Sequence, residues 1–188
     1  MTESVRERLI GSAVELVQRH GVAGTSVADL LERSGVARRS VYLHFPGGKN
    51  ELITASVEEA GNTIGAMIER LVTTQSPPES LSAFIEFWKH LLTGSDFEAG
   101  CPIAAAAYGG QEAPEAREQA HRVFAHWQDL LVPRLTAYGI DEADASAVAT
   151  TTIAAIEGAV MLCLADRDTA PLDRVHSQLQ RLLPPQTG

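Results

Sequence analysis

The stretch Thr25–Leu52, TSVADLLERSGVARRSVYLHFPGGKNEL, decides the fold of this chain. A helical apolar pattern runs to about Ser34, Gly35 suits a tight turn, and a second, short and polar helical segment ends near His44. Two helices joined by so short a turn are typical of a helix-turn-helix, whose second helix enters the DNA major groove. We therefore predict that these residues form a DNA-binding head.

The remaining sequence is also helical in its apolar period, and no segment favours a strand. We predict an all-α fold of about nine helices, with a head at residues 1–48 and a body at residues 49–188. The expected helices cover residues 5–20, 26–34, 37–44, 49–72, 78–92, 101–110, 114–138, 142–165 and 172–183. Ser26 and Asp29 fit a capping box at the start of the second helix.

The charge is divided unevenly along the chain, whose net charge is −9. Residues 1–49 hold seven basic and five acidic residues, whereas the remainder holds eight basic and nineteen acidic residues. A polyanion such as DNA is therefore attracted to the first part and repelled by the second.

Several function classes find no support in the sequence. The histidines and cysteines show no metal-ligand spacing, and there is no nucleophile–base motif or phosphate-binding glycine loop, so we expect no metal, no cofactor and no enzyme activity. No apolar run reaches the length of a membrane span, and the N-terminus lacks the apolar region of a signal peptide. The two cysteines form no disulfide framework. We expect a cytoplasmic protein without a membrane partner.

The segment from Ala13 to Phe45, AVELVQRHGVAGTSVADLLERSGVARRSVYLHF, closely resembles the TetR family of bacterial transcriptional regulators. The resemblance is carried by Gly35-Val36, Val41-Tyr42 and His44-Phe45. It implies a repressor that dimerises, binds a palindromic double-stranded operator, and leaves it when a small molecule binds the body.

The resemblance also implies which residues contact DNA. By position, the second helix of the motif turns Arg38, Arg39, Ser40, Tyr42 and His44 toward the duplex. Either arginine could form a bidentate pair with guanine or contact phosphate only; the tyrosine and the histidine fit phosphate contacts that set the register. The hydroxyls of Thr25 and Ser26 could also meet phosphate, although the second is equally explained as a helix cap.

Two features depart from the family pattern. Ala37 stands where a serine or threonine often caps the recognition helix. The phosphate-binding lysine usually lies three residues after the phenylalanine, whereas Lys49 lies four residues after Phe45. The DNA contact of this lysine is therefore less certain than the others.

The body resembles one branch of the family, the LmrA/YxaF-like regulators, at residues 45–49, 100–103, 156–159 and 171–174. The branch implies a mostly apolar pocket for a lipophilic or aromatic effector. The bulky candidates for its wall are Met67, Phe84, Trp88, Tyr108, Phe124 and Trp127. Each of them could equally belong to the core. Glu157, a carboxylate within an apolar run, could anchor an effector or pair with another group.

The family dimerises through its last two helices. Small residues at Ala147, Thr151, Ala155 and Ala159 would let a partner helix approach closely. Two other functions remain open at this point: a helical ligand carrier or small enzyme that uses the pocket, and a DNA-binding activator without an effector.

Overall fold

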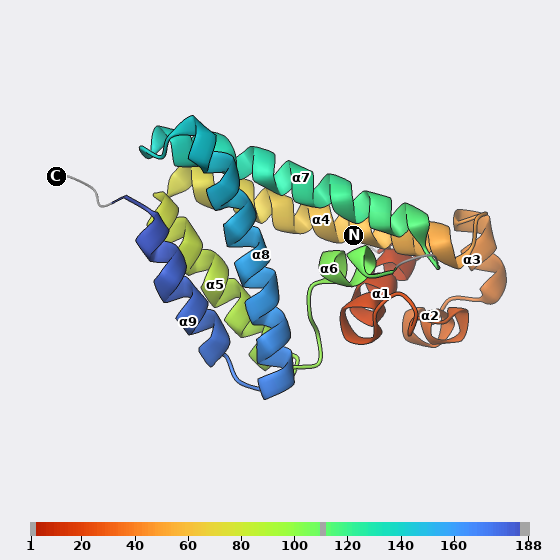
Figure 1. The fold of residues 1–188 in the computed structure, drawn as a ribbon. Coiled ribbons are helices and arrows are strands. Elements are labelled where there is room, and N and C mark those ends of the chain that lie inside the picture. The colour runs from red at the N-terminus through yellow and green to blue at the C-terminus, as the bar shows by residue number, and fades with distance from the viewer. Residues whose placement is uncertain (1–2, 110–111, 185–188) are drawn as a thin grey trace. The chain divides into compact units, whose positions relative to one another are not determined.

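The computed structural model describes residues 3–109 and 112–184, and these residues form helices and no strands. The predicted all-α fold is confirmed. In the described ranges the elements are α1 (Val5–His20), α2 (Val27–Ser34), α3 (Arg38–His44), α4 (Lys49–Thr74), α5 (Pro77–Gly94), α6 (Pro102–Ala107), α7 (Pro114–Ala137), α8 (Glu142–Asp166), α9 (Ala170–Leu179) and the short 3-10 helix η1 (Gln180–Leu182) (Figure 1).

Most helix ends agree with the prediction to within about two residues. The last helix differs, because it begins at Ala170 and its final turn tightens into η1. The predicted end of the sixth helix, Gly109-Gly110, lies partly outside the described residues.

The chain forms two compact units. The first comprises residues 1–63 and 101–124, and the second comprises residues 64–100 and 125–188. Two long helices, α4 and α7, therefore contribute residues to both units. The division into a head and a body at residue 48 stays a prediction about function.

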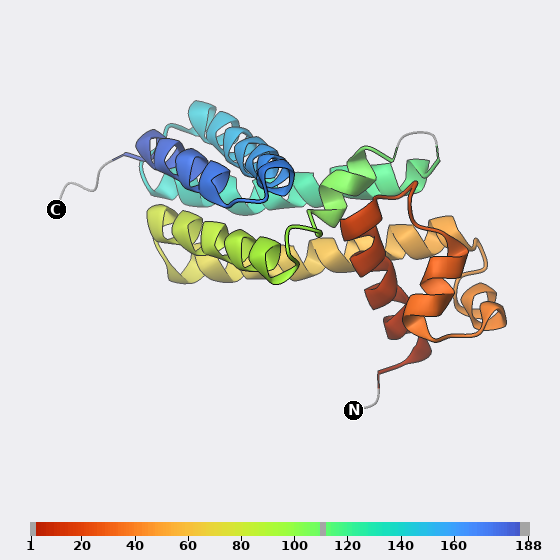
Figure 2. The ribbon, with the colours of Figure 1, turned by 90° about the horizontal axis from the view of Figure 1, so that it is seen from below.

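The core of the first unit joins α1, α2, α3 and the start of α4. Its fully buried side chains include Leu9, Leu30, Val41, Phe45 and Leu52. Helix α1 lies beside α2 (Figure 2), and it also contacts α3 and α6. The guanidinium of Arg6 covers the ring of Phe45 at 5.4 Å. These contacts fix α3 through its buried side and leave its other side exposed.

In the first unit, α4 and α7 approach closely at Gly61. A methyl group added there would lie 2.4 Å from Cγ2 of Val123, closer than any real carbon–carbon contact. Only glycine fits at this point of the crossing.

The second unit contains α5, α8 and α9, each of which contacts the other two (Figure 1). Lys89 of α5 forms an ion pair of 3.0 Å with Asp173 of α9. The loop after α5 is joined to the end of α8 by a 2.7 Å ion pair between Asp96 and Arg167. Apolar burial and these exposed ion pairs fix the three helices against one another.

Candidate nucleic-acid interface and ligand pocket

The start of α2 is fixed by the predicted capping box. The Ser26 hydroxyl accepts a hydrogen bond from the backbone N–H of Asp29 at 3.1 Å, and the Asp29 carboxylate accepts from the Ser26 N–H at 3.1 Å. The hydrogen bonds from Ser26 lower the pKa of the Asp29 carboxyl below its ordinary value. Ser26 itself is exposed. This confirms the cap, and the phosphate contact of Ser26 stays a prediction.

Thr25, the other residue expected at this helix start, lies inside the unit. Its side chain is fully buried, and its hydroxyl donates to the carbonyl of Gly21 at 2.8 Å. The hydroxyl is therefore already used and faces away from solvent. We do not include Thr25 in the DNA-contacting surface.

The turn between α2 and α3 is short because Gly35 has a left-handed conformation, with φ of 64°. Its N–H donates to the carbonyl of Leu31 at 3.0 Å. From the opposite side, Arg8 of α1 donates to the carbonyl of Ser34 at 2.7 Å. Ala37 begins α3 without any side-chain cap, as the sequence predicts.

The exposed side of α3 carries Arg38, Arg39, Tyr42 and His44, and Ser40 is half-buried beside them. The two arginine side chains have no ion pair or hydrogen bond with the described residues. Two other arginines of this unit do have partners, because Arg8 bonds to Ser34 and Arg33 pairs with Glu15. The two cations on α3 therefore remain available to an external anion.

Lys49 is the first residue of α4 and is half-buried. The turn before it is closed by hydrogen bonds from Gly48 N–H to the Phe45 carbonyl at 2.8 Å and from Gly47 N–H to the Glu51 carboxylate at 2.7 Å. This turn thus contains the one extra residue that separates Phe45 from Lys49 in this chain. The phosphate contact of Lys49 stays a prediction.

The sequence analysis overlooked Leu43. Its side chain is 74 % exposed, one helical turn after Arg39 on the same side of α3. The polar residues around Leu43 in the sequence could have indicated its exposure, since a leucine on the exposed side of a short polar helix is unusual. The exposed side of α3 therefore contains an apolar group as well as cations.

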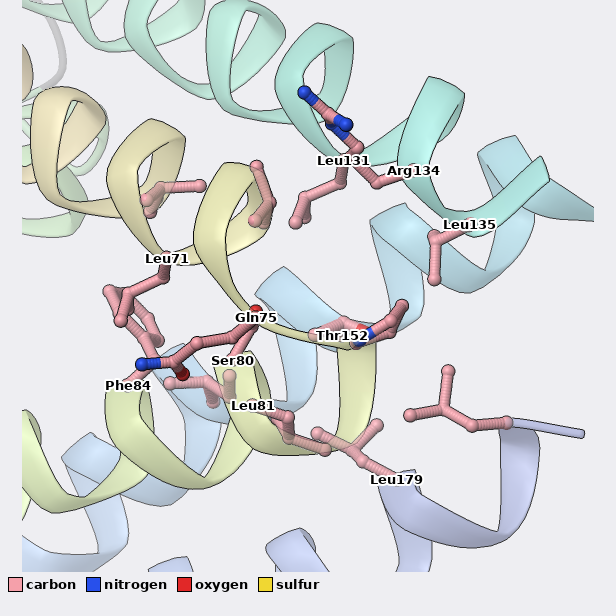
Figure 3. A pocket seen from close by; sticks show the side chains of 15 residues that line it. Leu71, Gln75, Ser80, Leu81, Phe84, Leu131, Arg134, Leu135, Thr152 and Leu179 are labelled. Carbon is pink, nitrogen blue, oxygen red and sulfur yellow. The ribbon is translucent and has the colours of Figure 1, made fainter. Parts of the chain in front are cut away.

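A pocket lies in the second unit, among α4, α5, α7, α8 and the C-terminal residues (Figure 3). Its cavity volume is about 80 Å³, and it is partly open to solvent. The apolar wall includes Ile68, Leu71, Leu81, Phe84, Leu131, Leu135, Ile156, Leu179 and Leu183. Four polar side chains complete it: Gln75, Ser80, Arg134 and Thr152.

Of the predicted pocket residues, the structure places only Phe84 in this wall. Trp88 and Trp127 are buried core residues, 0 % and 2 % exposed. Trp88 packs edge-on against Phe84, with ring centres 6.3 Å apart. Helical spacing does not distinguish a core aromatic from a pocket aromatic, which explains the difference.

The other predicted pocket residues lie elsewhere. Tyr108 belongs to the first unit and is 77 % exposed, and Phe124, half-buried, also belongs to that unit. Met67 and Glu157 are half-buried in the second unit and do not line the pocket, although Glu157 follows the lining residue Ile156. Most of this wall comes from aliphatic residues, none of which was among the predicted pocket residues.

Helix α8 has an exposed apolar side. By length and composition alone, α8 could cross a membrane, which corrects the expectation that no apolar run reaches that length. Only 28 % of the most apolar window of this helix is buried inside the protomer. Ala147 and Thr151 are exposed and Ala155 is half-buried, whereas Ala159 is buried inside the protomer. The same exposed side continues to Met161 and Leu162, which are about half exposed.

The described residues contain no group of three or more histidine, cysteine or acidic side chains that could hold a metal ion. One serine–histidine contact exists, between Ser82 Oγ and His176 Nε2 at 3.0 Å. The Ser82 hydroxyl donates its proton to the carbonyl of Pro78 at 2.8 Å, so the histidine is not placed to accept that proton.

The comparisons with known proteins agree with this geometry. Residues 9–55 match the family described as bacterial regulatory proteins, tetR family, and residues 77–178 match the C-terminal domain of LmrA/YxaF-like transcriptional regulators. The chain is 38 % identical to an uncharacterised HTH-type transcriptional regulator, Rv0196 of Mycobacterium tuberculosis, over 95 % of this chain and 93 % of that one. It is 28 % identical to the HTH-type transcriptional regulator LmrA of Bacillus subtilis, over 95 % and 96 %.

Among solved structures, a TetR transcriptional regulator from Legionella pneumophila superposes with a TM-score of 0.86, at 22 % identity, over 97 % of this chain and 99 % of that one. That likeness concerns the fold. The family matches and the curated relatives carry the assignment further: the chain belongs to the TetR family of DNA-binding transcriptional regulators, in its LmrA/YxaF-like branch.

Proposed function

We propose that the protein is a dimeric repressor that binds a palindromic operator through α3 and leaves it when a small apolar molecule binds the second unit. The observation that carries the DNA-contacting part is the pair of exposed, unpaired guanidinium groups of Arg38 and Arg39. Either can form a bidentate pair with guanine in the major groove. Ser26, Ser40, Tyr42, His44 and Lys49 contact phosphate and set the register.

The exposed side of α8 supports the dimer. Members of this family bind DNA and dimerise, and a second copy would cover the apolar side that runs from Ala147 to Leu162. Gly158 lies on this helix with open space where a side chain would be. A partner helix can therefore come close without any rearrangement of the first protomer. Two-fold symmetry then presents two copies of α3 to two half-sites.

The pocket supports the effector. It is apolar, has a few polar groups, and lies among α4, α5, α7 and α8. One of its walls is formed by Ile68 and Leu71 of α4, the helix that begins at Lys49. A molecule that binds one arrangement of these walls more tightly shifts the population toward it, and DNA and effector then weaken each other by the same factor.

The enzyme alternative has less support, because the Ser82 hydroxyl is committed to the Pro78 carbonyl. An activator without an effector would use the same α3 surface, and nothing described here favours it over the repressor.

The test is selection of binding sequences from random duplex DNA by the full-length protein. Enrichment of a palindrome, with half-sites about one helical turn apart, is the expected result. A compound screen then asks which molecules release the selected DNA, and a reporter gene placed behind that sequence distinguishes repression from activation. If no sequence is enriched over random DNA, the assignment of α3 as the reading helix fails.

A further inference from the structure

Ser80 lies in the wall of the pocket, on the α5 side (Figure 3). Ser80 is buried, with 7 % of its surface exposed. Its hydroxyl oxygen is inaccessible to solvent and has no hydrogen-bond partner among the described residues. An unpaired hydroxyl in an apolar wall is costly, so native structures rarely keep one without a use.

Three other buried or half-buried helix serines form a hydrogen bond that Ser80 lacks. Ser34, Ser56 and Ser82 each donate to a carbonyl of their own helix, at 2.6, 2.7 and 2.8 Å. Ser80 forms no such bond, although its helical position offers the same kind of acceptor. The hydroxyl of Ser80 therefore has no partner within its own helix.

The surrounding side chains restrict the chemistry of that molecule. Around Ser80 the wall is apolar, with Leu81 and Phe84 on the same helix and Leu131 and Ile156 on others. No carboxylate lines the pocket, and its single charged group, Arg134, is exposed. The lining therefore suits a neutral or anionic molecule with an apolar body and offers nothing to balance a buried cation.

We propose that Ser80 is the polar anchor of this pocket. A small apolar molecule bound there places one hydroxyl or carbonyl oxygen within hydrogen-bonding distance of Ser80 Oγ. A serine hydroxyl both donates and accepts, so it serves phenols, alcohols and ketones alike. This inference rests on the proposed effector site, and it adds to it the requirement for a polar atom at a defined place on the ligand.

The experiment compares two probes of nearly equal shape, 1-naphthol and naphthalene, by fluorescence titration of the full-length protein. The wild type should bind 1-naphthol more tightly than naphthalene. Ser80→Ala should weaken 1-naphthol binding about threefold to tenfold, the worth of one hydrogen bond, and leave naphthalene binding unchanged.

The matched control is Ser56→Ala, which removes an equally buried serine whose hydroxyl is satisfied by the Ile53 carbonyl. Ser56→Ala should lower the melting temperature, whereas Ser80→Ala should leave it unchanged or raise it, because it removes an unpaired polar atom. Both variants should keep operator affinity.

Three results would overturn the anchor. They are equal losses for both probes in Ser80→Ala, no binding of either probe up to its solubility in water, and a melting temperature that falls as far in Ser80→Ala as in Ser56→Ala. Each of these leaves operator selection intact, so failure of the anchor is distinguishable from failure of the DNA-binding function.

Discussion

The surfaces of α3 and α8 are both exposed, yet they suit opposite kinds of partner. The α3 surface presents cations without internal counter-charges, and it contains a single large aliphatic side chain, Leu43. The exposed side of α8 is apolar and small, and ends in Met161 and Leu162. The α3 surface attracts a polyanion over a distance set by the salt concentration. The α8 surface stabilises a complex only when another apolar surface excludes water from it. The two steps of operator binding, assembly and recognition, should therefore respond oppositely to salt.

The largest effect should follow from disrupting the α8 surface. Thr151→Arg places a charge in the middle of the exposed side, so the second copy could associate only by burying it. We expect a monomer by sedimentation and operator affinity reduced about a hundredfold or more, because the two half-sites are then no longer bound together. Thr73→Arg, at an exposed threonine of α4, is the control and should remain dimeric. A monomeric wild-type protein with full operator affinity would refute the symmetric model.

Next in size is the loss of base reading by Arg39. Arg39→Ala should cost roughly 1–3 kcal/mol of operator binding and relax the preference at one base pair, as measured by titration of single-position operator variants. The matched control is Arg33→Ala, since that arginine is already paired with Glu15 and lies on the surface. Equal losses for the two variants would mean that Arg39 contributes charge alone and reads no base.

A smaller effect should come from Leu43. Its exposed side chain fits an apolar contact with the methyl group of thymine, the base-specific contact that leucine is able to make in the major groove. Replacing one operator thymine by uracil should cost the wild type about 1 kcal/mol or less, and the same replacement should cost Leu43→Ala nothing. If wild type and variant respond alike at every thymine, Leu43 reads no methyl group.

The smallest effect concerns acid. The pKa of Asp29 is lowered in the folded state by its bonds to Ser26, so this carboxylate stabilises the fold above its ordinary pKa, and that contribution is lost as the pH falls below it. In chemical unfolding, the difference between wild type and Asp29→Asn should therefore be present at neutral pH and shrink below about pH 4. A difference that stays constant down to pH 3 would show that the cap works without its charge.

The same two regions differ in how far the sequence predicts them. The helices of the helix-turn-helix were predictable to within about one residue because their signals are local: a capping box at Ser26 and Asp29, and a glycine at position 35 that takes the left-handed conformation. Thr25 is the exception, since only the structure shows its hydroxyl turned back to the Gly21 carbonyl.

Of the residues that the sequence suggested for a pocket, only Phe84 lines the pocket that the structure contains. The wall of this pocket is formed by helices that are distant in sequence. One of its polar residues, Ser80, cannot be distinguished from a surface serine when only the sequence is known. The tryptophans were chosen for their size, but they fill the core, where large side chains bury the most apolar area. Sequence periodicity tells which side of a helix is apolar, and it does not tell where packing leaves a space.

The missing cap at Ala37 has a consequence for how quickly the protein finds its site. Without a side-chain bond at its start, we expect a helix of seven residues to fray in the free protein, so that part of its ordering would occur on the DNA. The entropy lost in that step is offset by the many contacts of the operator and poorly offset by random sequence. Residence on non-operator DNA is thereby shortened. Ala37→Ser should supply the bond and lengthen the time spent on every sequence, so that the protein would hold DNA more firmly and search it more slowly.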